Sequence, residues 1–106
     1  MKDETNIKTL KTYYFNKNNK SFEDKKAAAM AINDIIFYNN DIGDFGVEWG
    51  IVREGTHAKD IFCSFERKSD EKKIKNMFIN YGFTLQKTKR GFWITGVKKN
   101  ESRKIN

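Results

Sequence analysis

Aromatic and basic residues in this chain are of the types that bind single-stranded nucleic acid. Trp93 lies between a basic stretch at 87–90 and a pair of lysines at 98–99. An exposed aromatic ring can stack on an unpaired base, while neighbouring cations neutralise phosphates. We expect the aromatic candidates on the side of their strands that faces away from the core. The predicted interface residues are Tyr14, Phe62, Lys87, Lys89, Arg90, Trp93, Lys98 and Lys99.

The charge is distributed unevenly along the chain. Residues 67–106 contain twelve Lys or Arg against three Asp or Glu, whereas residues 30–66 contain two against seven. The chain has 17 Lys and only 4 Arg. Lysine is a point charge, and arginine is the planar fork that reads guanine, so binding is predicted to be backbone-directed, weakly sequence-specific and salt-sensitive. An AT-rich genome is the alternative source of the lysines, but it does not explain the acidic middle.

Acidic residues of that middle segment predict a second patch, which would meet a protein partner. A surface with separate positive and negative regions can steer a small protein onto a nucleic-acid-binding partner. The predicted acidic patch consists of Asp41, Asp44, Glu48 and Glu54.

Catalytic and metal-binding chemistry have few candidates. His57 is the only histidine and Cys63 the only cysteine. With Asp60 they are too few to build a structural zinc site, which needs four Cys or His ligands. His57 beside Glu54 or Lys59 is the one possible acid–base group. The sequence therefore predicts a non-enzymatic protein with no cofactor and no metal.

Periodicity and turn residues predict seven elements. Ser21 and Ser69 are expected to cap two amphipathic helices, and Gly82 is expected to end the second. Residues 1–8 and 99–106 are expected to be flexible. The predicted strands are 9–15, 47–53, 59–67, 83–87 and 92–97, and the predicted helices are 21–38 and 69–81.

The order β-α-β-β-α-β-β indicates one α+β domain. Its sheet is expected to be mostly antiparallel, with four or five strands and both helices on one face. This layout resembles ferredoxin-like folds and RNA-recognition motifs, and it leaves one sheet face uncovered. The resemblance covers topology only, because the run from Lys59 to Phe65 lacks the glycine of the RNA-recognition signature on the third strand.

A second resemblance covers about a quarter of the chain. The stretch from Lys72 to Gly96, with its Tyr-Gly-Phe and basic hairpin, looks like part of the small mRNA-cleaving toxins that have a double-stranded-RNA-binding-domain-like fold. Those toxins carry a catalytic histidine on the second hairpin strand. Phe92 and Trp93 occupy that region here, and His57 lies in a different turn. The resemblance therefore keeps RNA cleavage as a third hypothesis.

These features predict a small binding protein of phage or mobile-element type. Its basic surface would dock on a nucleic-acid-bound host complex, as an inhibitor of a host nuclease does, and anti-CRISPR proteins are of this general kind. The alternative is a stand-alone, weakly sequence-specific binder of single-stranded RNA or DNA. The single cysteine, the polar N-terminus and the lack of an 18-residue apolar run predict a cytoplasmic protein without a membrane segment. The oligomeric state stays open.

Overall fold

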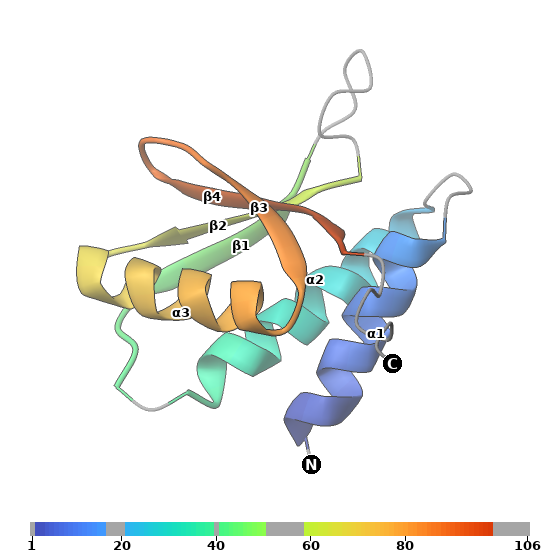
Figure 1. Cartoon of the computed structure of the whole chain (residues 1–106), viewed down its shortest axis with the longest axis horizontal. Helices are drawn as coiled ribbons and strands as arrows, with labels where there is room; N and C mark the ends of the chain where they lie inside the picture. The colour runs from blue at the N-terminus through green and yellow to red at the C-terminus, as the bar shows by residue number, and fades with distance from the viewer. Residues whose placement is uncertain (1, 17–20, 40, 51–58, 99–106) are drawn as a thin grey trace, which may run out of the picture.

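The computed structural model describes residues 2–16, 21–39, 41–50 and 59–98. All neighbouring strands pair antiparallel in one four-stranded sheet of order β1-β2-β4-β3. The three helices lie on the same side of this sheet (Figure 1). The elements are α1 (Lys2–Phe15), α2 (Phe22–Phe37), β1 (Phe45–Trp49), β2 (Ile61–Phe65), α3 (Lys68–Asn80), β3 (Phe83–Lys87) and β4 (Gly91–Val97).

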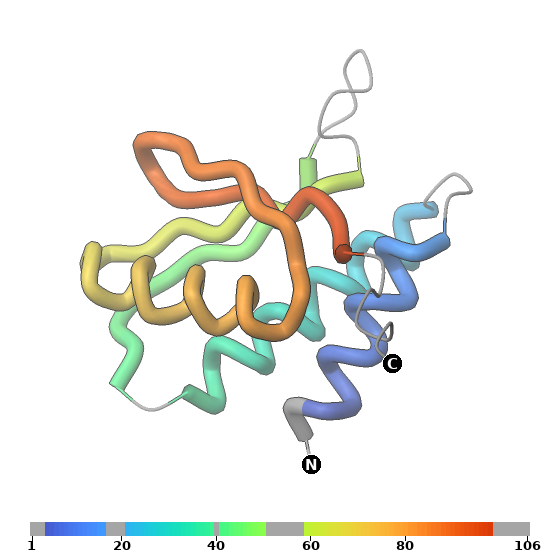
Figure 2. Tube along the Cα trace, in the orientation of Figure 1, coloured from blue at the N-terminus to red at the C-terminus, as the bar shows by residue number. Residues whose placement is uncertain are grey.

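The predicted first strand, residues 9–15, is wrong, because this segment belongs to helix α1. Aromatic and β-branched residues favour a strand locally, but tertiary packing overrides that preference. Ile7, Leu10 and Tyr13 follow a helical spacing and are all buried. They pack against α2, which runs beside α1 in Figure 2. The α+β class is confirmed, but with three helices and no opening strand the ferredoxin-like arrangement is not.

Both remaining helices form where the sequence predicts them, by different means. The Ser21 hydroxyl accepts from the Asp24 N–H and the Asp24 carboxylate accepts from the Ser21 N–H, each at 3.1 Å, so α2 begins with a capping box. Helix α3 begins at Lys68, and its N-cap is Arg67 rather than the predicted Ser69. Gly82 ends α3 with a φ of 100°, a conformation that glycine adopts without strain.

The core lies between the helices and one face of the sheet. Alternate strand residues point to this covered face, where Ile61, Cys63, Phe92 and Ile94 are fully buried. Phe78 of α3 packs edge-on against Phe92, at a ring-centroid distance of 6.4 Å. The intervening residues point to the opposite, open face, on which no helix of the described chain lies (Figure 1).

Candidate nucleic-acid interface

The open face carries two aromatic rings at its centre. The strand register places Phe62 of β2 directly opposite Trp93 of β4, with Glu48 and Gln86 as the outer neighbours in the same row. The two ring centroids are 5.0 Å apart and the planes are tilted by 55°. Both side chains are half-buried. Pairing of the two central strands therefore holds an aromatic platform at a fixed place on the open face.

A shallow pocket of about 410 Å³ adjoins this aromatic pair. Arg90 contributes a positive charge to its lining and Glu48 a negative one. A planar ring placed here would contact aromatic carbons and find both a donor and an acceptor at the rim. The pocket is lined by Glu48, Trp49, Gly50, Phe62, Arg90 and Trp93.

The turn between β3 and β4 fixes the position of Arg90. The Thr88 N–H donates to the Gly91 carbonyl at 2.8 Å, and the Arg90 N–H donates to the Thr88 hydroxyl at 3.2 Å. Gly91 is required by close packing, since a Cβ at this position would lie 2.0 Å from the carbonyl oxygen of Cys63. The tight turn thus places Arg90 beside Trp93 on the open face and leaves the neighbouring Lys89 exposed.

Among the described residues, the predicted cations Lys87 and Lys98 do not flank Trp93. The Lys87 ammonium lies 2.7 Å from the carboxylate of Glu71, a side chain of α3 that is only 6% exposed. Lys87 pairs with Phe92 in the register, so its side chain leaves the sheet toward the helices. Lys98 lies beyond the far end of β4. Lys99 falls outside the described residues.

Tyr14 does not join the aromatic pair either. It is a helix residue of α1, and its hydroxyl donates to the Ile94 carbonyl at 2.6 Å. Burial raises its pKa well above the ordinary value, so the phenol stays neutral and holds α1 to β4. The prediction that Tyr14 is an exposed aromatic residue on a strand is wrong, because residues 9–15 belong to helix α1.

The predicted acidic patch is not one cluster in the described chain. Glu48 lies on the open face beside Phe62, whereas Asp41 and Asp44 lie in the loop before β1. That loop is tied down by its backbone, since the Asp41 carbonyl accepts from Arg67 at 2.6 Å. Glu54 lies outside the described residues. The open face therefore carries charges of both signs.

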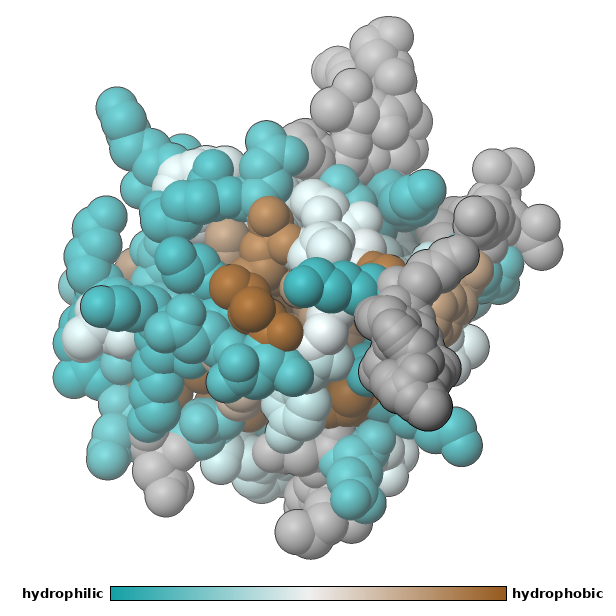
Figure 3. Space-filling view, viewed as in Figure 1, coloured by the Kyte–Doolittle hydropathy of each residue, from teal (hydrophilic) through white to brown (hydrophobic). Residues whose placement is uncertain are grey.

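Basic residues on α3 were absent from the predicted interface. Lys68, Lys72 and Lys75 follow a helical spacing and lie away from the core, Lys75 half-buried and the other two exposed. The surface around α3 is mostly hydrophilic in Figure 3, although Ile79 near the end of the helix is 44% exposed. The sequence could have predicted this, because the same helical period that buries Ile74 and Phe78 places these lysines on the solvent side of α3. The basic C-terminal region is therefore divided between the two sides of the sheet.

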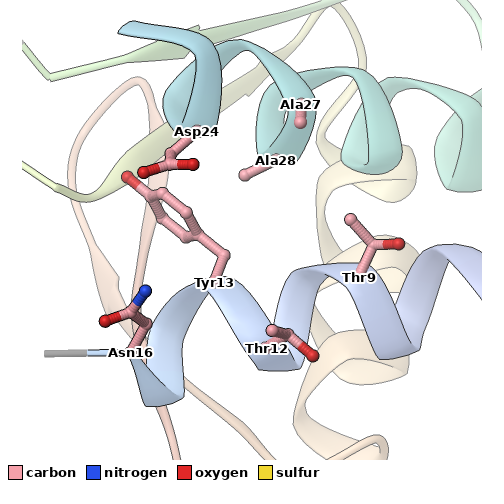
Figure 4. Close-up of a pocket in the computed structure, with 7 residues that line it drawn as sticks. All are labelled: Thr9, Thr12, Tyr13, Asn16, Asp24, Ala27 and Ala28. Atoms are coloured by element: carbon pink, nitrogen blue, oxygen red, sulfur yellow. The ribbon is translucent and has the colours of Figure 1, made fainter. Parts of the chain in front are cut away.

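A groove between α1 and α2 is an alternative site (Figure 4). Its lining includes the hydroxyls of Thr9 and Thr12, the phenol of Tyr13 and the Asp24 carboxylate, without a cation. Tyr13 donates to the Lys59 carbonyl at 2.7 Å, and burial raises its pKa. Asp24 caps α2. Tyr13 and Asp24 therefore already have structural partners, and the lining offers no positive charge to a phosphate.

The remaining reactive candidates give no site within the described ranges. Cys63 is fully buried, and desolvation raises the pKa of its thiol, which keeps it protonated. No group of three His, Cys, Asp or Glu side chains gathers in the described parts of the chain. His57 lies outside them. None of the described helices is long and apolar enough to cross a bilayer.

Comparison with protein-family models, curated proteins and solved structures found no match to this chain. The geometry of the open face is therefore the basis for a functional proposal.

Proposed function

We propose that this protein is a non-enzymatic binding domain whose open face takes an unpaired nucleobase on Phe62 and Trp93. The strand that supplies the base belongs to a nucleoprotein complex, and occupying it would inhibit a nuclease that needs the same strand. The observation that carries this proposal is the ring pair at 5.0 Å on the two central strands, beside a pocket that Arg90 lines. Stacking a base on an aromatic side chain contributes roughly 1–3 kcal/mol.

Rigidity supports stacking as the mode of binding. Phe62 and Trp93 are directly opposed in the register, and each is half-buried against its neighbours. The platform therefore loses little side-chain freedom when a ligand binds, which lowers the cost of association. A base laid on it would place its phosphate within the region that Lys89 and Arg90 serve.

The charge around the platform favours a nucleoprotein over a free strand. Arg90 lines the pocket beside Trp93 and exposed Lys89 precedes it in the same turn, whereas Glu48 lies on the other side of the aromatic pair. Two cations release few counterions, so affinity for bare nucleic acid should be low at physiological salt. A protein partner would supply the remaining contacts.

A titration of labelled single-stranded oligonucleotides tests the platform. Trp93→Ala and Phe62→Ala should each weaken binding about ten-fold, since each removes one stacking surface. Phe15→Ala is the matched control, because Phe15 is 51% exposed on α1, away from the sheet face. Unchanged affinity of both platform variants would overturn the proposal.

The salt dependence of the same titration tests the assigned cations. Contact through Lys89 and Arg90 alone predicts that log K falls with log salt at a slope between about −0.7 and −1.4. The double variant Lys89→Glu, Arg90→Glu should abolish that slope, whereas Lys72→Glu on α3 should not change it. A much steeper slope that becomes shallower in Lys72→Glu would show that the nucleic acid binds to α3 instead of the open face. Tight binding of a bare strand at physiological salt would favour the stand-alone binder.

A further inference from the structure

Helix α2 exposes three large apolar side chains on its outward side, among charged and polar ones. Its inner residues Ile32 and Ile35 are completely buried, as expected for a core helix. Its outer side exposes Phe22, Met30 and Phe37 by 61%, 57% and 66%. Large exposed apolar groups gathered on one helix face mark an interaction surface. The outer side of α2 is therefore a second candidate interface, unrelated to the open face of the sheet.

On this outer side, residues of opposite charge lie at equal distances from Met30, and aromatic residues lie at nearly equal distances. Lys26 lies four residues before Met30 and Asp34 lies four residues after it. Phe22 lies eight residues before and Phe37 seven residues after. With 3.6 residues per turn, all five positions fall on the same side of the helix. The outward stripe thus reads aromatic, basic, apolar, acidic, aromatic along α2, with exposed Glu23 and Asn33 on the same side.

A stripe of this kind is complementary to a second copy of itself turned end to end. A two-fold axis at Met30 would place Lys26 opposite Asp34 of the second copy, twice in each dimer. It would also bring Phe22 level with Tyr38 of the second copy, next to Phe37, and would bring Phe37 level with Glu23. An interface on a two-fold axis uses the same patch of both subunits and needs such self-complementarity.

A groove beside Met30 gives the second copy a place to pack. The groove has a volume of about 220 Å³ and lies between α2 and the edge strand β1. Trp49 forms part of its wall and is held there by edge-to-face contact with Phe22, at a centroid distance of 5.3 Å. Its lining residues are Lys26, Ala29, Met30, Asn33, Asp34, Val47 and Trp49.

We propose that this chain forms a two-fold symmetric homodimer through the outer side of α2, with the two α2 helices antiparallel and Met30 on the axis. Charge complementarity between Lys26 and Asp34 identifies the second copy, rather than an unrelated protein, as the occupant. Helix α2 covers the side of the sheet away from Trp93, so a dimer would leave both open faces free. The inference does not depend on nucleic-acid binding.

Sedimentation equilibrium over a range of protein concentrations tests this dimer. The wild-type chain should dimerise with a dissociation constant in the micromolar range. Lys26→Glu and Asp34→Lys should each raise that constant about ten-fold, because each sets two like-charged pairs across the axis. The double variant Lys26→Glu, Asp34→Lys should return it to near the wild-type value, since the pairs are restored with reversed sign. Met30→Glu should leave only monomer.

Two controls separate this interface from general effects. Lys72→Glu on α3 changes the net charge as Lys26→Glu does, and it should leave the dimer intact. Circular dichroism and thermal melting should show every variant folded, because the substituted side chains are all exposed. A wild-type chain that stays monomeric at the highest concentration would overturn the proposal. So would a double variant that dimerises no better than the single ones, or a Met30→Glu variant that still dimerises.

Discussion

Phe92 and Trp93 are neighbours on β4 that point to opposite faces of the sheet. Phe92 is completely buried beneath α3, whereas Trp93 is half-buried on the open face and contacts Phe62. Successive strand residues face opposite ways, so one residue of register separates a side chain that holds the fold from one available to a ligand. Residue type alone does not separate these roles, because both side chains are large and aromatic.

The largest expected effect tests that division directly. Phe92→Ala should lower the free energy of unfolding by about 3–5 kcal/mol, because it leaves a cavity among the helices and the sheet. Trp93→Ala should lower it by less, because Trp93 is only half-buried and its removal leaves no enclosed cavity; the aromatic pair contact accounts for roughly 0.5–1.5 kcal/mol of that loss beyond the buried area. Urea unfolding followed by circular dichroism measures both. Equal losses would show that the open face is part of the stabilising core and would remove the basis for a binding platform.

The second expected effect concerns the polar groups on the covered side. Asp70 accepts from the Gly43 N–H and from Arg67 Nε, each at 2.9 Å, and these donors lower the pKa of its carboxyl group. A carboxyl group whose pKa is lower in the folded state than in the unfolded state stabilises the fold. This stabilisation is fully present at pH values above the unfolded pKa of about 3.9, and it is lost as the pH falls through the folded pKa. Asp70→Asn should therefore unfold at lower urea than wild type at neutral pH, and the difference should narrow in acid.

The control for this comparison is Asp44→Asn, which changes an exposed carboxylate next to Gly43 in the loop before β1. Its urea midpoint should follow wild type at neutral pH. A difference between Asp70→Asn and wild type that stays constant from neutral to acidic pH would contradict the assigned role of the carboxylate charge.

Local signals were sufficient for most of the sheet and two of the helices. Alternation predicted that Ile61 and Cys63 share one face of β2 while Phe62 takes the other, and the burial of β2 confirms it. The cap at Ser21 and the end at Gly82 were also predicted, because each depends on residues within one turn. Helix α1 was missed because its helical state depends on tertiary packing, against α2 and against segments remote in sequence, such as β4, where the Ile94 carbonyl accepts from Tyr14.

The interface was predicted less completely than the fold. Proximity in sequence suggested that Lys87 and Lys98 would flank Trp93, but strand alternation turns Lys87 toward Glu71 and strand length carries Lys98 away. The sequence predicted that Phe62 and Trp93 each face away from the core, but not that they contact each other. Their contact depends on the pairing of β2 with β4, which joins residues 31 positions apart. Registers of that kind are not visible in a single sequence.

The smallest expected effect separates two cations at the ends of one turn. Lys87→Ala should lower the free energy of unfolding by about 1 kcal/mol, because it leaves the buried Glu71 carboxylate without its 2.7 Å ion pair. Arg90→Ala should change it by less than about 0.5 kcal/mol, since Arg90 is exposed. Their effects on oligonucleotide affinity should be in the reverse order, because Arg90 lines the pocket beside Trp93 while Lys87 points to the other side of the sheet. Measuring both quantities on both variants is decisive: if Lys87→Ala weakens binding more than Arg90→Ala does, the ligand does not use the open face.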